Sequence, residues 1–369
     1  MKNGASLLKS EALFTKHGWG NATMDDYKSI IEGLIEENKK LNQCQAQSEQ
    51  IIMQMVDYVE QLQKELEQTQ KNLKDLKGVV YMTRAHLLSL PYEMADPDYV
   101  SPVFKPHFMS ASATREAVKN GKSIGRLGDG EFAVIKGEER WNFQQPSEGL
   151  GKKIKEVLLS EDENFLVGLN PTFYSNLADL HEYDAIGVRA FMVPEERKFH
   201  ASLLKRDRIY ADALMCELKS DTDVSEVKQI WDKKNMFIIE GRYTRMGVGN
   251  DLFDNASSIK RILAPAQNAY DKYDAIMTEA MKLPKNSLVL IALGPTATAL
   301  SYDLYKEGYH AVDIGHLDLK YEQYIRKMDQ IRDVHISYKY CNSDEVGELR
   351  DIPAPDDPEY NNQIISIVE

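Results

Sequence analysis

The stretch SIGRLGDGEFAVIKG, residues 123–137, begins as a short apolar strand and stops at two carboxylates, Asp129 and Glu131. In an open α/β sheet, ligands bind outside the carboxyl ends of the strands, which is where these side chains are expected. An Asp-x-Glu segment in extended geometry points both carboxylates to one side, where they can hold Mg²⁺ or Mn²⁺. The alternative is a polar turn that follows a strand and binds nothing.

Three further residues of this stretch favour a binding site. Gly128 and Gly130 allow the backbone to turn tightly and a ligand to approach closely. Arg126 is unusual in a core strand, because a buried arginine needs an anionic partner. The strand end is therefore a candidate site for a metal ion and an anionic ligand.

Apolar runs and helical patterns alternate from about residue 107 to residue 350. The run SLVLIALG, residues 287–294, is dense enough for a sheet covered on both faces. The other predicted strands are 123–128, 165–170, 235–241 and 309–315, and the predicted helices are 112–122, 149–161 and 294–308. This order predicts an α/β fold with a Rossmann-like layered sheet. Residues 351–369 are expected to form a Pro-rich turn and a short terminal element.

A second candidate segment is ALGPTATAL, residues 292–300. A strand ends there, Gly294 turns the chain, and Thr296 lies near the start of a helix. The free N–H groups at a helix start favour a phosphate. The segment matches neither the Walker motif nor the dinucleotide glycine motif, and any strand-to-helix turn looks similar.

A third candidate segment, DIGHLDLKYE at residues 313–322, also follows a strand. His316 and Glu322 could serve as acid or base groups, with Asp313 and Asp318 close by. A lone histidine is more often a structural hydrogen-bonding residue.

The fourth candidate segment, residues 241–265, alternates glycine turns with polar side chains. These side chains are Arg242, Arg245, Asn250 and Asp251. We predict that a helix carrying Lys260 and Arg261 follows. A solvated loop is the alternative, but Gly247, Gly249 and Asn250 suggest backbone recognition of a flat ligand.

The four segments together describe an anionic ligand held by a metal ion, a helix start and arginine, with carboxylates nearby. A nucleotide-diphosphate sugar fits this description. From these segments we expect the nucleotide sugar to contact Arg126, Gly128, Arg245, Asn250, Asp251, Gly294 and Thr296.

Composition limits the remaining possibilities. The 369-residue chain has 45 basic and 58 acidic residues, a net charge of −13, which argues against broad nucleic-acid binding. Its three cysteines show no metal-ligand or disulfide spacing. No signal peptide and no apolar run of about 18 residues is present, so we expect a soluble, cytoplasmic protein.

The N-terminal part differs from the rest of the chain in composition and periodicity. Residues 1–23 are expected to be a mobile arm, residues 24–77 a coiled coil, residues 78–106 a connector, and residues 107–369 the catalytic domain. In the coiled coil, ten of fourteen seam positions are apolar. The first seam is Ile31, Asn38, Gln45, Ile52, Val59, Leu66 and Leu73, and the second is Leu34, Leu41, Ser48, Met55, Leu62, Thr69 and Leu76. The pattern predicts a dimer or trimer; a helix folded back on the body is the alternative.

Four motifs resemble the GT-D glycosyltransferases of bacterial protein- and surface-glycan pathways. They are RLGDGEF at 126–132, GVGNDLFDNASSIKRIL at 247–263, ALGPTATALSYDL at 292–304 and DIGHLDLKYE at 313–322. They occur in the family's order, and the coiled coil lies outside the match. The resemblance implies a GT-D fold and transfer of a sugar, most often UDP-linked, to an acceptor glycan.

The resemblance also implies roles for individual residues. Asp129 and Glu131 would be the family's Asp-x-Glu pair, bound to Mn²⁺ or Mg²⁺ and through it to the diphosphate. We expect Glu322 to act as the base for an acceptor hydroxyl if the enzyme inverts, with His316 lining the donor site. Two alternatives remain: a metal-dependent phosphohydrolase or phosphotransferase, and a coiled-coil assembly protein with an inactive transferase domain.

Overall fold

The computed structural model describes residues 23–139, 143–328, 334, 336–340, 352 and 354–369. The chain separates into a first unit, Met1–Tyr81, and a second unit, Met82–Glu369. The predicted arm at residues 1–23 lies outside the described residues, apart from Thr23. None of the helices in the described ranges is both long enough and apolar enough to span a membrane.

The second unit is built on a sheet whose described part has nine strands in the order β1-β4-β3-β2-β8-β7-β5-β6-β9. Every neighbouring pair is parallel. The strands are β1 His107–Phe108, β2 Ser123–Leu127, β3 Phe165–Leu169, β4 Ile209–Asp212, β5 Asn235–Gly241, β6 Ser258–Ala264, β7 Leu288–Ala292, β8 His310–Asp313 and β9 Ile364–Ile367. The predicted α/β fold with a layered parallel sheet is confirmed.

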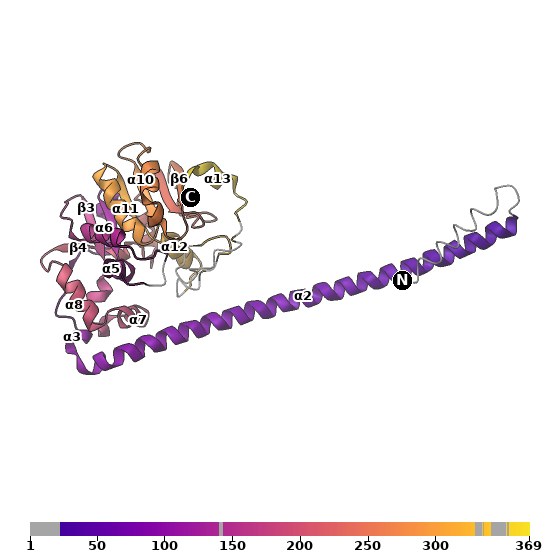
Figure 1. The fold of residues 1–369 in the computed structure, drawn as a ribbon, viewed down its shortest axis with the longest axis horizontal. Helices are drawn as coiled ribbons and strands as arrows, with labels where there is room; N and C mark the ends of the chain where they lie inside the picture. The colour runs from indigo at the N-terminus through magenta and orange to yellow at the C-terminus, as the bar shows by residue number, and fades with distance from the viewer. Residues whose placement is uncertain (1–22, 140–142, 329–333, 335, 341–351, 353) are drawn as a thin grey trace. The chain divides into compact units, whose positions relative to one another are not determined.

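Helices cover both faces of this sheet (Figure 1). They are α3 Pro97–Val100, α4 Ala111–Lys119, α5 Asp129–Lys136, α6 Glu148–Leu159, α7 Glu182–Phe191, α8 Pro194–Leu203, α9 Asp221–Lys228, α10 Tyr273–Ala280, α11 Pro295–Lys306, α12 Leu317–Ile325 and α13 Pro358–Gln363, with 3₁₀ turns η1 Pro171–Tyr174, η2 Leu177–Asp179, η3 Ala213–Cys216 and η4 Ala269–Lys272. Val289 and Ile291 of β7 pack with α5, α6, α10 and α11, whereas Leu288 and Leu290 pack with α4, α9 and α12. This alternation is why the β7 sequence is apolar throughout.

The predicted helix carrying Lys260 and Arg261 is wrong, because both residues lie in strand β6. Arg261 pairs in register with Ile238 of β5, and only 2% of it is exposed. Its Nη1 lies 2.6 Å from Oε1 of the fully buried Glu240. The buried ion pair with the neighbouring strand satisfies the Arg261 charge inside the sheet, whereas Lys260 stays exposed.

The first unit is dominated by one helix, α2, which runs from Met24 to Ala95 and so continues past Tyr81 into the second unit. The helix therefore continues past the predicted boundary at residue 77 and through most of the predicted connector, residues 78–106. A glycine inside a helix is only about 1 kcal/mol less favourable than alanine, so Gly78 does not end the helix. Most of the residues that follow are adequate helix formers. The chain leaves the helix at Asp96, whose side chain caps α3 and is followed by Pro97.

Helix α5, which follows β2, is anchored to α8 by a buried cluster. Lys136 donates to Oε2 of Glu196 at 2.7 Å, and Nε2 of His200 lies 3.7 Å from Oε1 of the same carboxylate. Phe132 stacks on the His200 ring with centroids 3.6 Å apart. Burial alone would raise the pKa of Glu196, but the hydrogen bonds and charges of His200 and Lys136 outweigh it and lower this pKa to about 2.

We predict that Glu196→Gln lowers the free energy of unfolding by about 1–3 kcal/mol at pH 7, because it replaces the buried carboxylate shared by Lys136 and His200 with a neutral amide. The folded pKa lies below the unfolded value of about 4.3, so this contribution is complete above pH 5 and is lost as the pH falls toward 2. Urea unfolding at several pH values measures both effects.

Glu138→Gln is the matched control, because Glu138 is exposed and binds the same Lys136 at 2.5 Å. We expect it to change the free energy of unfolding by no more than about 0.5 kcal/mol. If both variants lose the same free energy of unfolding, the buried ion pair of Glu196 is no more stabilising than the exposed pair of Glu138.

Candidate functional site

Two cavities open at the carboxyl end of the sheet, at points where the chain leaves neighbouring strands in opposite directions. From β2 the chain goes on to β3, and from β8 it goes on to β9 at the far edge. A cavity of about 230 Å³ opens there, which we call the larger cavity. The chain goes from β7 to β8 and from β5 to β6, again in opposite directions along the sheet. The smaller cavity, of about 90 Å³, opens between the ends of β7 and β5. Such divergence points are where open α/β sheets bind ligands.

The larger cavity is polar. Its charged and polar lining consists of Arg126, Glu131, Asn170, Glu217, Asp313, His316 and Lys320. Lys320 is buried and lies 2.7 Å from Glu217. Two cations and three carboxylates therefore surround one space, which suits a ligand with both anionic groups and hydroxyls.

An ion pair joins the two strands below this cavity. Nη2 of Arg126 lies 3.3 Å from Oδ1 of Asp313, and the backbone N–H of Arg126 donates to Oδ2 at 3.2 Å. The Thr298 hydroxyl donates to the same Oδ2 at 3.3 Å. The predicted anionic partner of Arg126 is thus Asp313. Burial raises the pKa of the Asp313 carboxyl, and the contacts with Arg126 oppose this rise.

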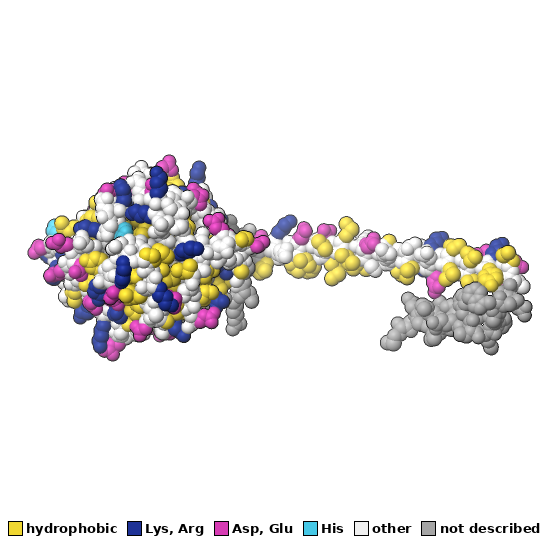
Figure 2. All heavy atoms as spheres, turned by 90° about the horizontal axis from the view of Figure 1, so that it is seen from above, with side chains coloured by type: hydrophobic (Ala, Val, Ile, Leu, Met, Phe, Trp, Pro, Cys, Tyr) yellow, Lys and Arg dark blue, Asp and Glu magenta, His cyan; other side chains and the backbone are white. Residues whose placement is uncertain are grey.

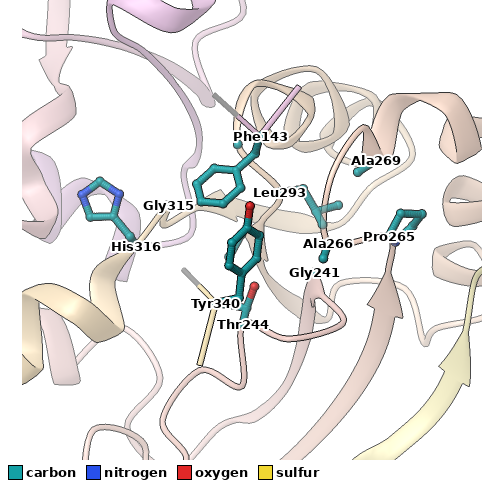
Figure 3. A pocket seen from close by; sticks show the side chains of 12 residues that line it. Phe143, Gly241, Thr244, Pro265, Ala266, Ala269, Leu293, Gly315, His316 and Tyr340 are labelled. Atoms are coloured by element: carbon teal, nitrogen blue, oxygen red, sulfur yellow. The ribbon is translucent and has the colours of Figure 1, made fainter. Parts of the chain in front are cut away.

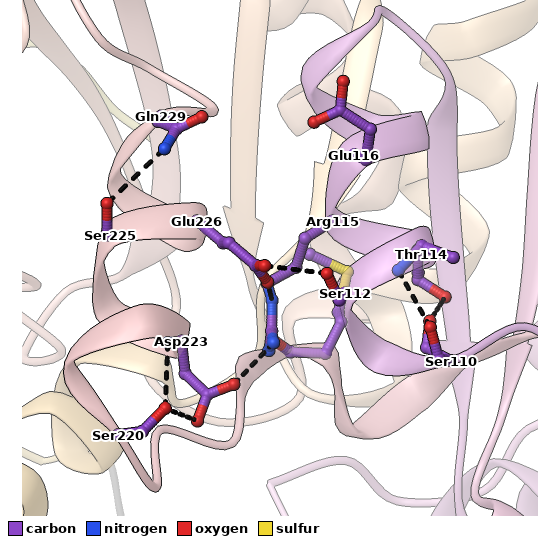
Figure 4. A network of polar contacts seen from close by, with 12 residues as sticks. Ser110, Ser112, Thr114, Arg115, Glu116, Ser220, Asp223, Ser225, Glu226 and Gln229 are labelled. Carbon is purple, nitrogen blue, oxygen red and sulfur yellow. Dashed lines mark hydrogen bonds and ion pairs between the residues drawn. The ribbon is translucent and has the colours of Figure 1, made fainter.

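The guanidinium of Arg126 is held from a second side by η3. Its Nη1 donates to the carbonyl of Ala213 at 3.0 Å, while its buried Nε has no hydrogen-bond partner among the described residues. Arg115 fixes η3 from behind, since its Nη1 donates to the carbonyl of Met215 at 3.0 Å. Arg115 also binds Asp223 and Glu226 of α9, as Figure 4 shows. Buried arginines thus connect the cavity wall to the helices below it.

Asp129 and Glu131 do not lie in the extended geometry that we expected. They occupy the first turn of α5, which begins directly after Gly128, and Oε2 of Glu131 accepts the Gly128 N–H at 2.7 Å. Residues two apart on a helix do not face each other, so the two carboxylates diverge. Glu131 lines the larger cavity, whereas Asp129 lines neither cavity.

The electrostatics around Glu131 nevertheless favour a cation. Burial, together with the negative charges of Asp313 and Asp129, raises the pKa of Glu131 to about 7. Within the described ranges, no group of three or more His, Cys, Asp or Glu side chains is arranged to hold a metal ion. Mg²⁺ typically binds through one or two carboxylates plus substrate phosphates and water. The residues therefore fit a cation that enters with a phosphate ligand, and not a site closed by protein alone.

The start of α11 separates the two cavities. Gly294, at φ 55°, lines both of them. Thr296 is fully buried, and its hydroxyl donates to Oε1 of Gln144 at 3.0 Å. Thr296 thus supports the cavity wall from behind.

His316 also lines both cavities and stands at the start of α12. The surrounding protein and the cations Lys320 and Arg126 lower the pKa of its imidazole, although the side chain itself stays exposed in the open cavity. The lowered pKa indicates a neutral ring at pH 7.

The predicted residues of the third and fourth segments mostly lie elsewhere. Asn250 donates to Oδ1 of Asp318 at 2.8 Å and to Oε1 of Glu322 at 2.6 Å. Asp251 is exposed and pairs with Lys228 at 2.9 Å, and Arg245 donates to the carbonyl of Tyr338. None of Arg245, Asn250, Asp251 and Glu322 lines either cavity. Glu322 also accepts from Arg326 at 2.8 Å, so each of its carboxylate oxygens has a hydrogen-bond partner.

Sequence reasoning missed several lining residues. Asn170 ends the predicted strand FLVGLN, so its position at a strand end was a usable signal. Lys320 lies within the candidate segment DIGHLDLKYE, so the sequence could have suggested it as a cationic site residue beside the carboxylates of that segment. Phe143 and Tyr340 lie far from any predicted strand end, and no local pattern marks them.

Comparisons with known proteins agree with this architecture. The family model for the glycosyltransferase GT-D fold matches residues 124–344. The chain is 34% identical over 260 residues to a probable glycosyl transferase Gly of Streptococcus gordonii, covering 68% of this chain and 37% of that protein. It is 30% identical over 257 residues to the glycosyltransferase GlyD of Streptococcus pneumoniae serotype 4, covering 68% and 31%. The match thus spans about a third of the length of these relatives.

Two solved structures are similar as well. A glycosyltransferase (DUF1792) from Streptococcus sanguinis has 30% identity and a TM-score of 0.62, and the match covers 72% of this chain and 100% of that one. A structure described as the highly conserved domain of unknown function 1792 with a distinct glycosyltransferase fold has 28% identity and a TM-score of 0.66, covering 73% and 99%.

We predict that Gly315→Ala disturbs the Arg126 contact. Gly315 has φ 50°, and a Cβ there would lie 2.1 Å from Nη2 of Arg126. Gly308 is the matched control, because it has φ 86° and no atom within 4 Å of the built Cβ. Gly308→Ala should cost about 1–2 kcal/mol from backbone strain alone. Gly315→Ala should cost at least about 1 kcal/mol more in denaturant unfolding; equal costs would show that Arg126 moves aside freely.

Proposed function

The chain belongs to the GT-D family of glycosyltransferases, and we propose that it transfers a sugar from a nucleotide sugar, a UDP-linked hexose, to an acceptor glycan in bacterial protein or surface-glycan biosynthesis. The observation that carries this proposal is the larger cavity, where Arg126 and Lys320 stand among carboxylates at the divergence of β2 and β8. A diphosphate needs cations, and a sugar needs hydrogen-bonding groups that both donate and accept.

The diphosphate of the donor would bind between Arg126 and the start of α11. The Arg126 guanidinium is already oriented by Asp313 and Ala213, so little side-chain freedom remains to be lost on binding. The N-terminus of the 12-residue helix α11 adds a favourable dipole for an anion.

We propose Mn²⁺ or Mg²⁺ as the cofactor, bound by Glu131 in the larger cavity, with Asp129 of the same helical turn adding negative charge. When bound, the cation would neutralise the charge that develops on the departing nucleotide. The protein's own contribution is to bury Glu131 near Asp313 and Asp129, and this burial and negative charge raise the pKa of Glu131 to about 7.

The two expected acid–base residues receive different roles. His316 faces the cavity, and a neutral imidazole can donate one hydrogen bond and accept another from donor or acceptor hydroxyls. Glu322 lines neither of the two cavities and accepts from Asn250 and Arg326, so we propose that it positions the 247–250 loop.

The test is thermal unfolding with UDP, UDP-sugars, GDP and a simple phosphate ester, each with Mn²⁺ or with EDTA. A ligand at about 100 times its Kd stabilises the folded state by about 2.7 kcal/mol, a shift of several degrees. We expect a Mn²⁺-dependent shift with UDP compounds that is lost in Glu131→Gln, because Glu131 lines the larger cavity. Asp251→Asn should leave the shift unchanged, because Asp251 lies outside both cavities.

Transfer itself is followed by mass spectrometry of an acceptor glycan incubated with the best-binding UDP-sugar. Turnover of the phosphate ester without any UDP response would favour a phosphohydrolase instead. Binding of UDP without transfer or donor hydrolysis would favour an assembly protein.

We also propose that α2 joins two copies of the chain as a parallel coiled coil. The ten apolar seam residues between Ile31 and Leu76 are 44–69% exposed, and Figure 2 shows hydrophobic side chains gathered along the helix. The same seven-residue register continues beyond residue 77 at Val80, Leu87, Leu90 and Met94, which are 51–80% exposed. In the second unit, α2 buries Ala85 and Ser89 on another side. The exposed apolar seam thus continues along the part of α2 whose other side is buried in the second unit.

Two features favour a parallel pair in register. Ile31, Ile52 and Val59 provide β-branched residues in the first seam and leucines dominate the second, the pattern of parallel dimers. The flanking positions that face each other in such a pair are apolar together at Ile30 with Ile35, and at Ile51 with Val56.

We predict that the chain sediments at twice its 42.1 kDa mass. Leu87→Glu should raise the dimer dissociation constant at least about tenfold, because it buries a charge in the seam. Leu88→Glu is the matched control, since Leu88 is 48% exposed one residue off the seam, and it should change little. Equal dissociation constants for both variants would show that pairing stops before the second unit.

A further inference from the structure

The residues that line the larger cavity come from the ends of five neighbouring strands, which lie in the order β7-β8-β2-β3-β4. Gly294 follows β7, His316 follows β8, and Arg126 belongs to β2. Asn170 follows β3, and Glu217 follows β4 and the turn η3. The cavity therefore has a β7 end, next to the start of α11, and an opposite end with Asn170 and Glu217, which we call the β4 end.

The smaller cavity contributes no carboxylate. The rings of Phe143 and Tyr340 lie together there, and His316 stands apart from them, as Figure 3 shows. None of the described residues that line this cavity is acidic. A carboxylate that acts on a ligand of this site therefore comes from the larger cavity.

Two of the three carboxylates of the larger cavity already have another role. The Asp313 carboxylate accepts hydrogen bonds from four donors, and Glu131 is the proposed ligand of the cation. Glu217 is different. Its Oε1 lies 2.7 Å from Nζ of Lys320, its Oε2 has no hydrogen-bond partner in the part of the chain that the structure describes, and 28% of its side chain is exposed. Glu217 can therefore accept a hydrogen bond from a ligand.

The backbone before Glu217 is held in place without a ligand. The N–H of Glu217 donates to the carbonyl of Leu214 at 2.8 Å, and Oδ1 of Asp212 caps η3 by accepting the N–H of Leu214 at 2.7 Å. The turn lies directly on β3, since a Cβ at Gly168 would be 3.4 Å from Cα of Ala213. The Glu217 carboxylate is thus preorganised, and preorganisation of a reacting group lowers the entropy cost of the reaction.

Asn170 offers a fixed amide donor at the same end. Its Oδ1 accepts the N–H of Thr172 at 3.0 Å and the Thr172 hydroxyl at 2.7 Å. A backbone N–H only donates, so the atom that faces it is the oxygen, and the orientation of the amide is determined. Nδ2 of Asn170 has no hydrogen-bond partner among the described residues and remains available at the cavity lining. A hydroxyl group can accept from such a donor while it donates to a carboxylate.

We propose that the β4 end of the larger cavity receives the acceptor hydroxyl and that Glu217 is the base that deprotonates it; this deepens, and rests on, the proposed function. Asn170 orients the acceptor oxygen, and Glu217 takes its proton. The oxygen forms a bond to the anomeric carbon of the donor. The bond from that carbon to the diphosphate breaks, and its electron pair leaves with the nucleoside diphosphate.

The strand order supports this direction of attack. The diphosphate lies next to the start of α11, at the β7 end, and Glu217 lies at the β4 end. A direct displacement needs the attacking and the leaving oxygen on opposite sides of the anomeric carbon, and the two ends of the cavity supply these sides. Such a displacement inverts the configuration of the anomeric carbon.

The experiment uses the full chain with Mn²⁺, the donors UDP-glucose, UDP-galactose and UDP-N-acetylglucosamine, and p-nitrophenyl β-glucoside and β-N-acetylglucosaminide as acceptor probes. Calorimetry gives the Kd of UDP, and UDP release to the probes or to water gives kcat and KM. Glu217→Gln keeps the shape of the side chain and removes the base. It should lower kcat at least about 100-fold. It should change the Kd of UDP and the KM of the donor less than about threefold.

Glu279→Gln is the matched control. Glu279 is 27% exposed, pairs with Lys282 at 2.6 Å and lines neither cavity, so its variant should leave all these constants unchanged. Asn170→Ser tests the second residue, because serine can still cap η1 but lacks the amide donor. It should raise the KM of the acceptor probes at least about fivefold and leave the Kd of UDP unchanged.

The outcomes separate this inference from the proposed function. If the wild-type chain does not bind UDP, or binds it and releases no UDP from any donor, the proposed function fails and this inference with it. If the wild type is active and Glu217→Gln keeps its kcat or loses UDP binding, only the assignment of Glu217 fails. Retention of the anomeric configuration in the product, read by NMR on the wild type, would also overturn the assignment.

Discussion

The ion pair between Arg126 and Asp313 is the contact on which the candidate site depends. It joins the ends of β2 and β8, where the chain leaves two neighbouring strands in opposite directions. Four donors, including the Thr298 hydroxyl of α11 and the N–H of Gly315, converge on the Asp313 carboxylate. A buried charge pair is stable only when its remaining hydrogen-bonding capacity is satisfied in this way.

The pair also restricts what surrounds it. Gly315 must lack a side chain because the guanidinium occupies the space of its Cβ. The Ala213 carbonyl brings η3 to the other side of Arg126, and Arg115 anchors that turn to α9. Arg126 at the cavity and Arg115 behind it thus join elements that are distant in sequence into one wall.

A second buried network supports the neighbouring loop. Asp318 and Glu322 of α12 together hold Asn250, and Lys339 lies 2.5 Å from Oδ2 of Asp318. These carboxylates look catalytic in the sequence because they lie close after a strand. In the fold these two carboxylates accept hydrogen bonds from the loop and do not line the larger cavity. The carboxylates that do line it are Glu131, Glu217 and Asp313.

The sequence by itself determined the α/β class, the strand ends that approach the site and the apolar seam of α2, because each follows from local periodicity or from residues adjacent in the chain. Only the tertiary structure decided that Arg261 lies in a strand, that Asp129 and Glu131 diverge on a helix, and that Phe143 meets Tyr340. These outcomes depend on partners such as Glu240 on another strand, or on loops nearly two hundred residues apart. No local pattern encodes contacts between segments that meet only after the sheet has formed.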